Sequence, residues 1–228
     1  MKKNILVLTT LAFSMAAFQA CKDSDRSKKT TTDTATHNDG MTNAHNGDAM
    51  AEHDQMIKEM IEEMNTMTMT GDFDLDYATM MIPHHQSAVE MAEMYLPKGK
   101  DEKIKSMAQN IITSQKKEIE DLKVLIANHN TAGNKESYPD KGHGDGEHNE
   151  IMEAMNTMMD KMKGMQMSGD ADRDFVTMMI PHHESAVMMS QNEISHGKHF
   201  EMKKMAQKII EDQNMEIKQF QEWLAKTK

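Results

Sequence analysis

Apolar side chains recur at helical spacing along the longest unbroken stretches of this chain. Between about 101 and 128 they fall every three or four residues, at Ile104, Met107, Ala108, Ile111, Ile112, Ile119, Leu122 and Ile126. This period matches one face of an α-helix. No window shows the sustained alternation of apolar and polar residues that a half-buried strand requires. The pattern therefore predicts an all-α fold.

The helical pattern occurs twice, at an offset of 98 residues and without a gap. The run Thr-Met-Met-Ile-Pro-His-His at 79–85 recurs at 177–183. Two copies are too few for a solenoid, which needs at least three repeats. We predict an antiparallel helical bundle built from two tandem three-helix repeats, 51–130 and 149–228, with a Gly-rich linker at 131–148.

Start and stop signals divide each copy into three helices. In the first copy we expect helices at about 54–69, from 72 or 74 to 96, and at 101–128. Gly71 is a natural stop after the first helix, an acidic cap precedes the second, and Pro97 ends it. Pro83 falls inside the second expected helix. Either that helix begins near Pro83, or it is kinked there.

The first fifty residues have the pattern of a targeting signal followed by a tether. Two lysines precede a mostly apolar stretch at 5–17, which is too short to cross a membrane. We predict a signal peptide at 1–20, lipidation of Cys21 and a polar, flexible tether at 21–50. The expected location is periplasmic or at the cell surface, anchored at Cys21. The alternative is a soluble secreted protein cut nearby.

Composition adds a chemical clue and excludes several classes of protein. The 228 residues include 28 Met, 12 His and one Cys, but only 8 Leu, although Leu is normally among the commonest residues. One Cys excludes a disulfide framework and a CxxC zinc or redox site. The formal net charge of −11 does not fit a nucleic-acid binder or a polybasic membrane-surface domain.

Methionine and histidine gather on one face of the second expected helix. At about 100° per residue, one stripe holds Met80, His84, Ser87 and Met91, and its neighbour holds Met81, His85 and Ala88. Each His thus has a Met one turn before it, close enough for the two side chains to meet. The two adjacent His can serve two separate sites or one site between helices.

Thioether and imidazole together favour copper. Thioether sulfur is a soft donor that selects Cu(I) and, by extension, Ag(I), while imidazole also suits Cu(II). The candidate ligands are Met80, Met81, His84, His85, Met91, Met178, Met179, His182, His183 and Met189, with Met60, Met64, Met67, Met158, Met162 and Met165 as a second set. The alternative for any single Met is core packing, because Met fills irregular gaps. For the His pairs it is two satisfied core histidines.

A longer motif resembles a known family. Met-Ile-x-His-His-x-x-Ala-Val-x-Met is followed by Met-Ala-Gln-x-Ile-Ile-x-x-Gln-x-x-Glu-Ile, in both copies and within about 54–228. This is similar to the bacterial family called domain of unknown function 305. The resemblance implies a ferritin-like bundle, an extracytoplasmic location and copper binding in homeostasis or resistance. Its signature positions are Met81, His84, His85, Ala88 and Met91, with Met179, His182, His183, Ala186 and Met189.

These observations favour a binding protein that sequesters or buffers copper, with Cu(I) preferred, and not an enzyme. The expected partners are the metal ion, a membrane reached through the lipid anchor, and a second copy of the chain or a copper-transfer partner. One alternative is a di-iron ferritin-like oxidase, which needs paired Glu-x-x-His motifs. Only Glu193 and His196 form one, since Tyr95 and Lys98 stand there in the first copy. A Met-rich oxidant sink and an interaction module are further alternatives.

Overall fold

The structure is a computed structural model that describes residues 55, 57–64, 66–131, 145–163 and 165–227. These residues belong to one compact unit, 39–228. They form helices, turns and loops, with no strand among the described residues, so the all-α prediction is confirmed. The expected signal peptide, the tether and Cys21 lie outside the described residues.

The helices follow the order expected for two copies. They are α2 (Phe73–Tyr95), α3 (Glu102–Thr131), α4 (Asp145–Lys163), α5 (Ala171–His196) and α6 (Phe200–Lys226), preceded by a helical segment at 57–64. That segment gives way to a bend at residue 67, slightly earlier than expected. The last four residues of the expected linker, 145–148, are helical instead. No proline lies between Pro139 and Asp145, where α4 begins, so none blocks the first turn of that helix.

The loops before α2 and α5 contain the signals that end one helix and start the next. Gly71 and Gly169 have φ angles of 82° and 83°, in the left-handed region where glycine is favoured. Asp72 then caps α2 by accepting a hydrogen bond from the backbone N–H of Leu75, and Asp170 caps α5 in the same way. The acidic cap predicted from the sequence is confirmed.

Both internal prolines lie within continuous helices. Pro83 is inside α2 and Pro181 is inside α5. Because α2 starts ten residues before Pro83, at Phe73, the interpretation that the helix begins near this proline is wrong. Each proline lacks the N–H that would bond the residue four positions earlier.

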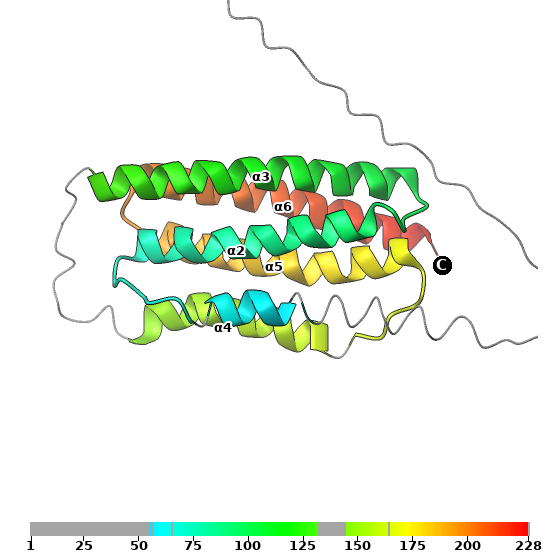
Figure 1. Cartoon of the computed structure of the whole chain (residues 1–228), viewed down its shortest axis with the longest axis horizontal. Coiled ribbons are helices and arrows are strands. Elements are labelled where there is room, and N and C mark those ends of the chain that lie inside the picture. The colour runs from blue at the N-terminus through cyan, green and yellow to red at the C-terminus, as the bar shows by residue number, and fades with distance from the viewer. Residues whose placement is uncertain (1–54, 56, 65, 132–144, 164, 228) are drawn as a thin grey trace, which may run out of the picture. The chain divides into compact units, whose positions relative to one another are not determined.

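The six helical segments of the described residues stack in three layers of two (Figure 1). The outer layers are α3 with α6, and α4 with the segment 57–64, while α2 and α5 form the middle layer. α2 packs on α3, α5 packs on both α6 and α4, and α2 contacts α5 across the boundary between copies. By contrast, α3 and α6 barely touch. The Met-His helices therefore lie where both copies can surround them.

Each copy caps a helix of the other. Asp172, near the start of α5, accepts hydrogen bonds from the Tyr95 hydroxyl and from the backbone N–H groups of 100–101. Asp74, near the start of α2, accepts from the backbone N–H groups of 198–199. The start of each middle helix thus lies beside the end of the other, so α2 and α5 run antiparallel.

Methionine supplies much of the hydrophobic core. The buried methionines are Met60, Met64, Met80, Met81, Met91, Met107, Met155, Met158, Met162, Met179, Met189, Met202 and Met205. They occupy positions that leucine fills in most helical proteins. Within the described part of the chain, no helix is both long enough and apolar enough to cross a bilayer.

Candidate metal centre

α2 and α5 bring one histidine from each copy together. The rings of His84 and His182 lie 4.1 Å apart between centroids. Both side chains are buried, with exposed fractions of 0% and 1%. Of the two arrangements left open by the sequence, this geometry corresponds to a site between helices. The two rings come from positions 98 residues apart, so neither copy alone contains the pair.

In each His-His motif, the second histidine faces an outer helix. His85 Nε2 lies 3.1 Å from Glu118 Oε2 in α3, and His183 Nε2 lies 2.8 Å from Glu216 Oε2 in α6. Adjacent residues on a helix point about 100° apart, which sends the two rings of a pair in different directions. The sequence motif therefore supplies an inner pair, His84 and His182, and an outer pair, His85 and His183.

His84 is held neutral by its surroundings, and its ring nitrogens have no protein partner. Burial lowers the pKa of His84 well below its usual range, and the charges of His85 and His183 lower it further. Neither ring nitrogen of His84 has a hydrogen-bond partner. Buried polar atoms are normally satisfied by protein, water or an ion. A neutral imidazole with a lone pair on one nitrogen is also the form that binds metals.

Thioethers approach the histidines from the layer formed by 57–64 and α4. The Ser87 hydroxyl lies 2.9 Å from Met60 Sδ and 2.7 Å from His182 Nε2. In the second copy the Ser185 hydroxyl lies 3.6 Å from Met155 Sδ. Ser87 thus brings a sulfur of one outer layer next to the inner pair of imidazoles.

The remaining predicted ligands are part of the core around these rings. Met80, Met81, Met91, Met179 and Met189 are buried on the middle helices, while Met178 is partly buried. In the second set, Met60, Met64, Met158 and Met162 are buried, while Met67 and Met165 are partly buried and pack against the core. Burial suits both packing and soft-metal binding. Among these thioethers, Met60 is the one that Ser87 links to the inner pair.

Two features of the site had only weak signals in the sequence. Met155 lies in a methionine stripe of α4 and carried no mark that set it apart from its neighbours. Glu118 and Glu216 follow the repeated Gln-x-x-Glu spacing, in which polar residues one helical turn apart are typical of a polar network between helices. The structure gives that network particular partners, because these two carboxylates contact the outer histidines.

The arrangement does not fit a di-iron centre. Among the described residues, no three His, Cys, Asp or Glu side chains gather as a metal-binding group. Burial and the neighbouring carboxyl of Asp74 raise the pKa of Glu193 to about 10, so this group is uncharged at neutral pH. His196 lies 3.0 Å from Glu150 instead.

The chain matches the model of a known protein family. The model of the family described as "Domain of unknown function (DUF305)" matches residues 14–126 and 74–224. The chain belongs to the DUF305 family. The two overlapping matches agree with the tandem copies seen in the sequence.

Solved structures similar to this chain include a protein studied with metals. CopM in its Cu(I)-bound form is 33% identical to this chain, with a TM-score of 0.48. The match covers 67% of this chain and 96% of CopM. CopM is also known in apo, Ag-bound and Cu(II)-bound forms. A DUF305 protein of Streptomyces coelicolor is 22% identical over 69% of this chain and 95% of that one, with a TM-score of 0.51, and shares the fold.

A curated relative matches over a shorter stretch. The uncharacterized protein L153 of Acanthamoeba polyphaga mimivirus is 38% identical over 53 residues. These residues make up 23% of this chain and 35% of the viral protein. The chain thus spans about a third of that relative's length.

Proposed function

We propose that this DUF305 protein binds Cu(I), and by the same chemistry Ag(I), and thereby sequesters or buffers the metal outside the cytoplasm. The observation that carries the proposal is the inner pair, in which His84 and His182 meet in the core beside the sulfur of Met60. Soft thioethers select Cu(I) over Zn²⁺, Mg²⁺ and Ca²⁺, and imidazole is also a good copper ligand.

The metal would be cargo that the protein holds and releases. The buried imidazoles would supply nitrogen and the surrounding methionines would supply uncharged sulfur, which suits a monovalent soft cation. The wider ligand set comprises the two His pairs with Met80, Met81, Met91, Met178, Met179 and Met189. The Cu(I)-, Cu(II)- and Ag-bound forms of CopM, a relative at about a third identity, support this proposal.

The proposed location and organisation follow from the sequence. A signal peptide at 1–20 would direct export, a lipid on Cys21 would attach the chain to a membrane, and 21–50 would act as a tether. Thioether sites suit an oxidising compartment, where thiolate ligands would be lost to disulfides. A second copy of the chain or a copper-transfer partner would then exchange metal with it.

Competition with a Cu(I) chelator tests the function. The purified protein is loaded under reducing, anaerobic conditions, and the copper it retains is measured against rising chelator and in the presence of Zn²⁺. We expect several Cu(I) per chain to be held more tightly than Zn²⁺. A variant with His84, His85, His182 and His183 all changed to Ala should lose most of the tight binding. Wild-type protein that retains no copper would contradict the proposal.

A further inference from the structure

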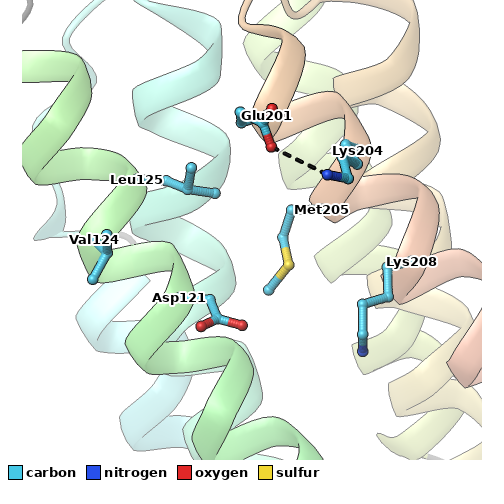
Figure 2. Close-up of a pocket in the computed structure, with 7 residues that line it drawn as sticks. All are labelled: Asp121, Val124, Leu125, Glu201, Lys204, Met205 and Lys208. Carbon is cyan, nitrogen blue, oxygen red and sulfur yellow. Dashed lines mark ion pairs between the residues drawn. The ribbon is translucent and has the colours of Figure 1, made fainter.

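The outer layer of α3 and α6 contains two pockets, because these helices barely touch each other. One pocket, of about 350 Å³, lies between the last turns of α3 and the first turns of α6 (Figure 2). The other, of about 260 Å³, lies further along and is lined by Met107, Asn110, Ser114, Asp212, Met215, Glu216 and Gln219. We call this second one the Glu216 pocket. It includes the carboxylate that contacts His183.

In the first copy the corresponding carboxylate is closed off from solvent. Glu118 contacts His85 through Oε2, and its Oε1 lies 2.7 Å from Lys208 Nζ. The Glu118 side chain is only 4% exposed. Burial works to raise the pKa of Glu118, but the contacts with His85 and Lys208 outweigh it and hold the pKa below its usual value. Lys208 also lines the pocket of Figure 2, next to Met205.

The second copy has no such cation at the matching position. The 98-residue offset that relates Glu118 to Glu216 relates Lys208 to Asn110, which lines the Glu216 pocket. The Glu216 side chain is 20% exposed, five times the value for Glu118. One face of the second His-Glu pair is thus open where the first is covered by a lysine.

The open pocket also carries donors for a soft cation. Met215 is 55% exposed at its rim, whereas Met107 is buried within the core. Behind Glu216, Nδ1 of the buried His183 has no hydrogen-bond partner. Exposed thioether, carboxylate and buried imidazole therefore follow one another from solvent toward the core.

We propose that the Glu216 pocket is an access site through which Cu(I) or Ag(I) reaches His183, and that Lys208 closes the equivalent path to His85. The proposal rests on the proposed copper-binding function. The cation would pass by ligand exchange from the sulfur of Met215, past the carboxylate of Glu216, to the imidazole. Positive charge on Lys208 opposes entry of a cation, while neutral Asn110 does not. The two copies would then load and release metal at different rates.

A matched pair of variants tests this difference on the full-length protein. Ag(I) or Cu(I) is loaded to saturation and its removal by excess chelator is followed by stopped flow. We expect a fast and a slow phase in the wild type. Asn110→Lys should slow the fast phase by about fivefold, the factor expected for one added charge near the cation path. Lys208→Asn should accelerate the slow phase by a similar factor.

Two controls separate the path from general effects of charge and packing. Gln109→Lys adds the same charge one residue away on α3 but outside the pocket lining, and should leave both phases unchanged. Met215→Leu keeps the apolar bulk and removes the sulfur, so it should slow the fast phase if the metal exchanges through this thioether.

The outcomes distinguish the access path from the function itself. If the wild type holds metal but Asn110→Lys and Lys208→Asn do not change the rates of the two release phases, the proposed access site is wrong and the copper-binding proposal stands. If Asn110→Lys and Gln109→Lys slow release equally, net charge and not the pocket sets the rate, and the proposal is also wrong. If the wild type holds no metal against the chelator, both proposals fail.

Discussion

At the scale of single residues, each His-His motif divides its two rings between different neighbours. His84 meets its counterpart His182 between copies, while His85 and His183 contact carboxylates of the outer helices. The sequence pattern predicted that all four histidines lie on helices with a methionine one turn before each. It could not show which His would meet which, because helical periodicity fixes a face but not the residue that packs against it.

Ser87 gives a test of how the inner pair is held. Its hydroxyl lies within hydrogen-bond distance of both Met60 Sδ and His182 Nε2. Ser87→Ala should weaken Cu(I) binding in chelator competition and lower the free energy of unfolding by about 1 kcal/mol. Ser185→Ala is the matched control, since Ser185 contacts Met155 at a longer distance of 3.6 Å. Equal copper affinity in the two variants would show that Ser87 does not position the site.

At the scale of elements, most helix boundaries could be predicted because the signals are local. Asp72, Gly71 and Pro97 lie next to the ends they mark, and the bounds of α2 agree with them. The start of α4 at Asp145 had no such signal, because glycine-rich sequence without proline weakens a helix but does not end it. The capping of one copy by an aspartate of the other depends on long-range packing, which no local signal contains.

Glu193 in α5 makes the stability of the fold depend on pH. Its pKa of about 10 in the folded protein lies above the ordinary value of 4.5. The stability that it contributes as a neutral acid is complete below about pH 4.5 and is lost as the pH rises toward 10. A neutral Glu193 can donate a hydrogen bond to Asp74, and glutamine can do the same without ionising.

Glu193→Gln should therefore gain stability over the wild type as the pH rises. We expect the difference in Tm between the two proteins to be small near about pH 5 and to grow steadily toward about pH 9. Glu222→Gln, at an exposed position of α6, is the control and should show no such trend. A difference in Tm that stays constant across this range would mean that Glu193 is ionised in the folded protein.

At the scale of the whole described unit, the two copies depend on each other. Asp172 satisfies the Tyr95 hydroxyl and the backbone N–H groups of 100–101, and Asp74 does the same for 198–199. The inner pair of histidines also needs both copies. Each copy therefore depends on contacts that the other supplies, and we expect the copies to unfold together.

Asp172→Ala tests this cooperation. Loss of an acceptor shared by three donors should cost about 3 kcal/mol and shift a single calorimetric transition to lower temperature. Asp174→Ala also removes an acceptor of three donors, but these lie in its own exposed loop at Ser168 and Gly169, where water can replace it, so the cost should be about 1 kcal/mol. Two separate transitions in Asp172→Ala, with the second copy melting at the wild-type temperature, would contradict cooperation between the copies.

We propose that imidazole and thioether together hold a soft monovalent cation in this bundle. X-ray absorption at the copper edge of the Cu(I)-loaded protein measures the ligands directly. We expect a Cu(I) edge with both nitrogen and sulfur in the first coordination sphere. We also expect a smaller nitrogen contribution when His84 and His182 are changed to Ala, because only His85 and His183 then remain as nitrogen ligands. Coordination by nitrogen and oxygen without sulfur, or a spectrum unchanged in that variant, would contradict ligation by imidazole and thioether together.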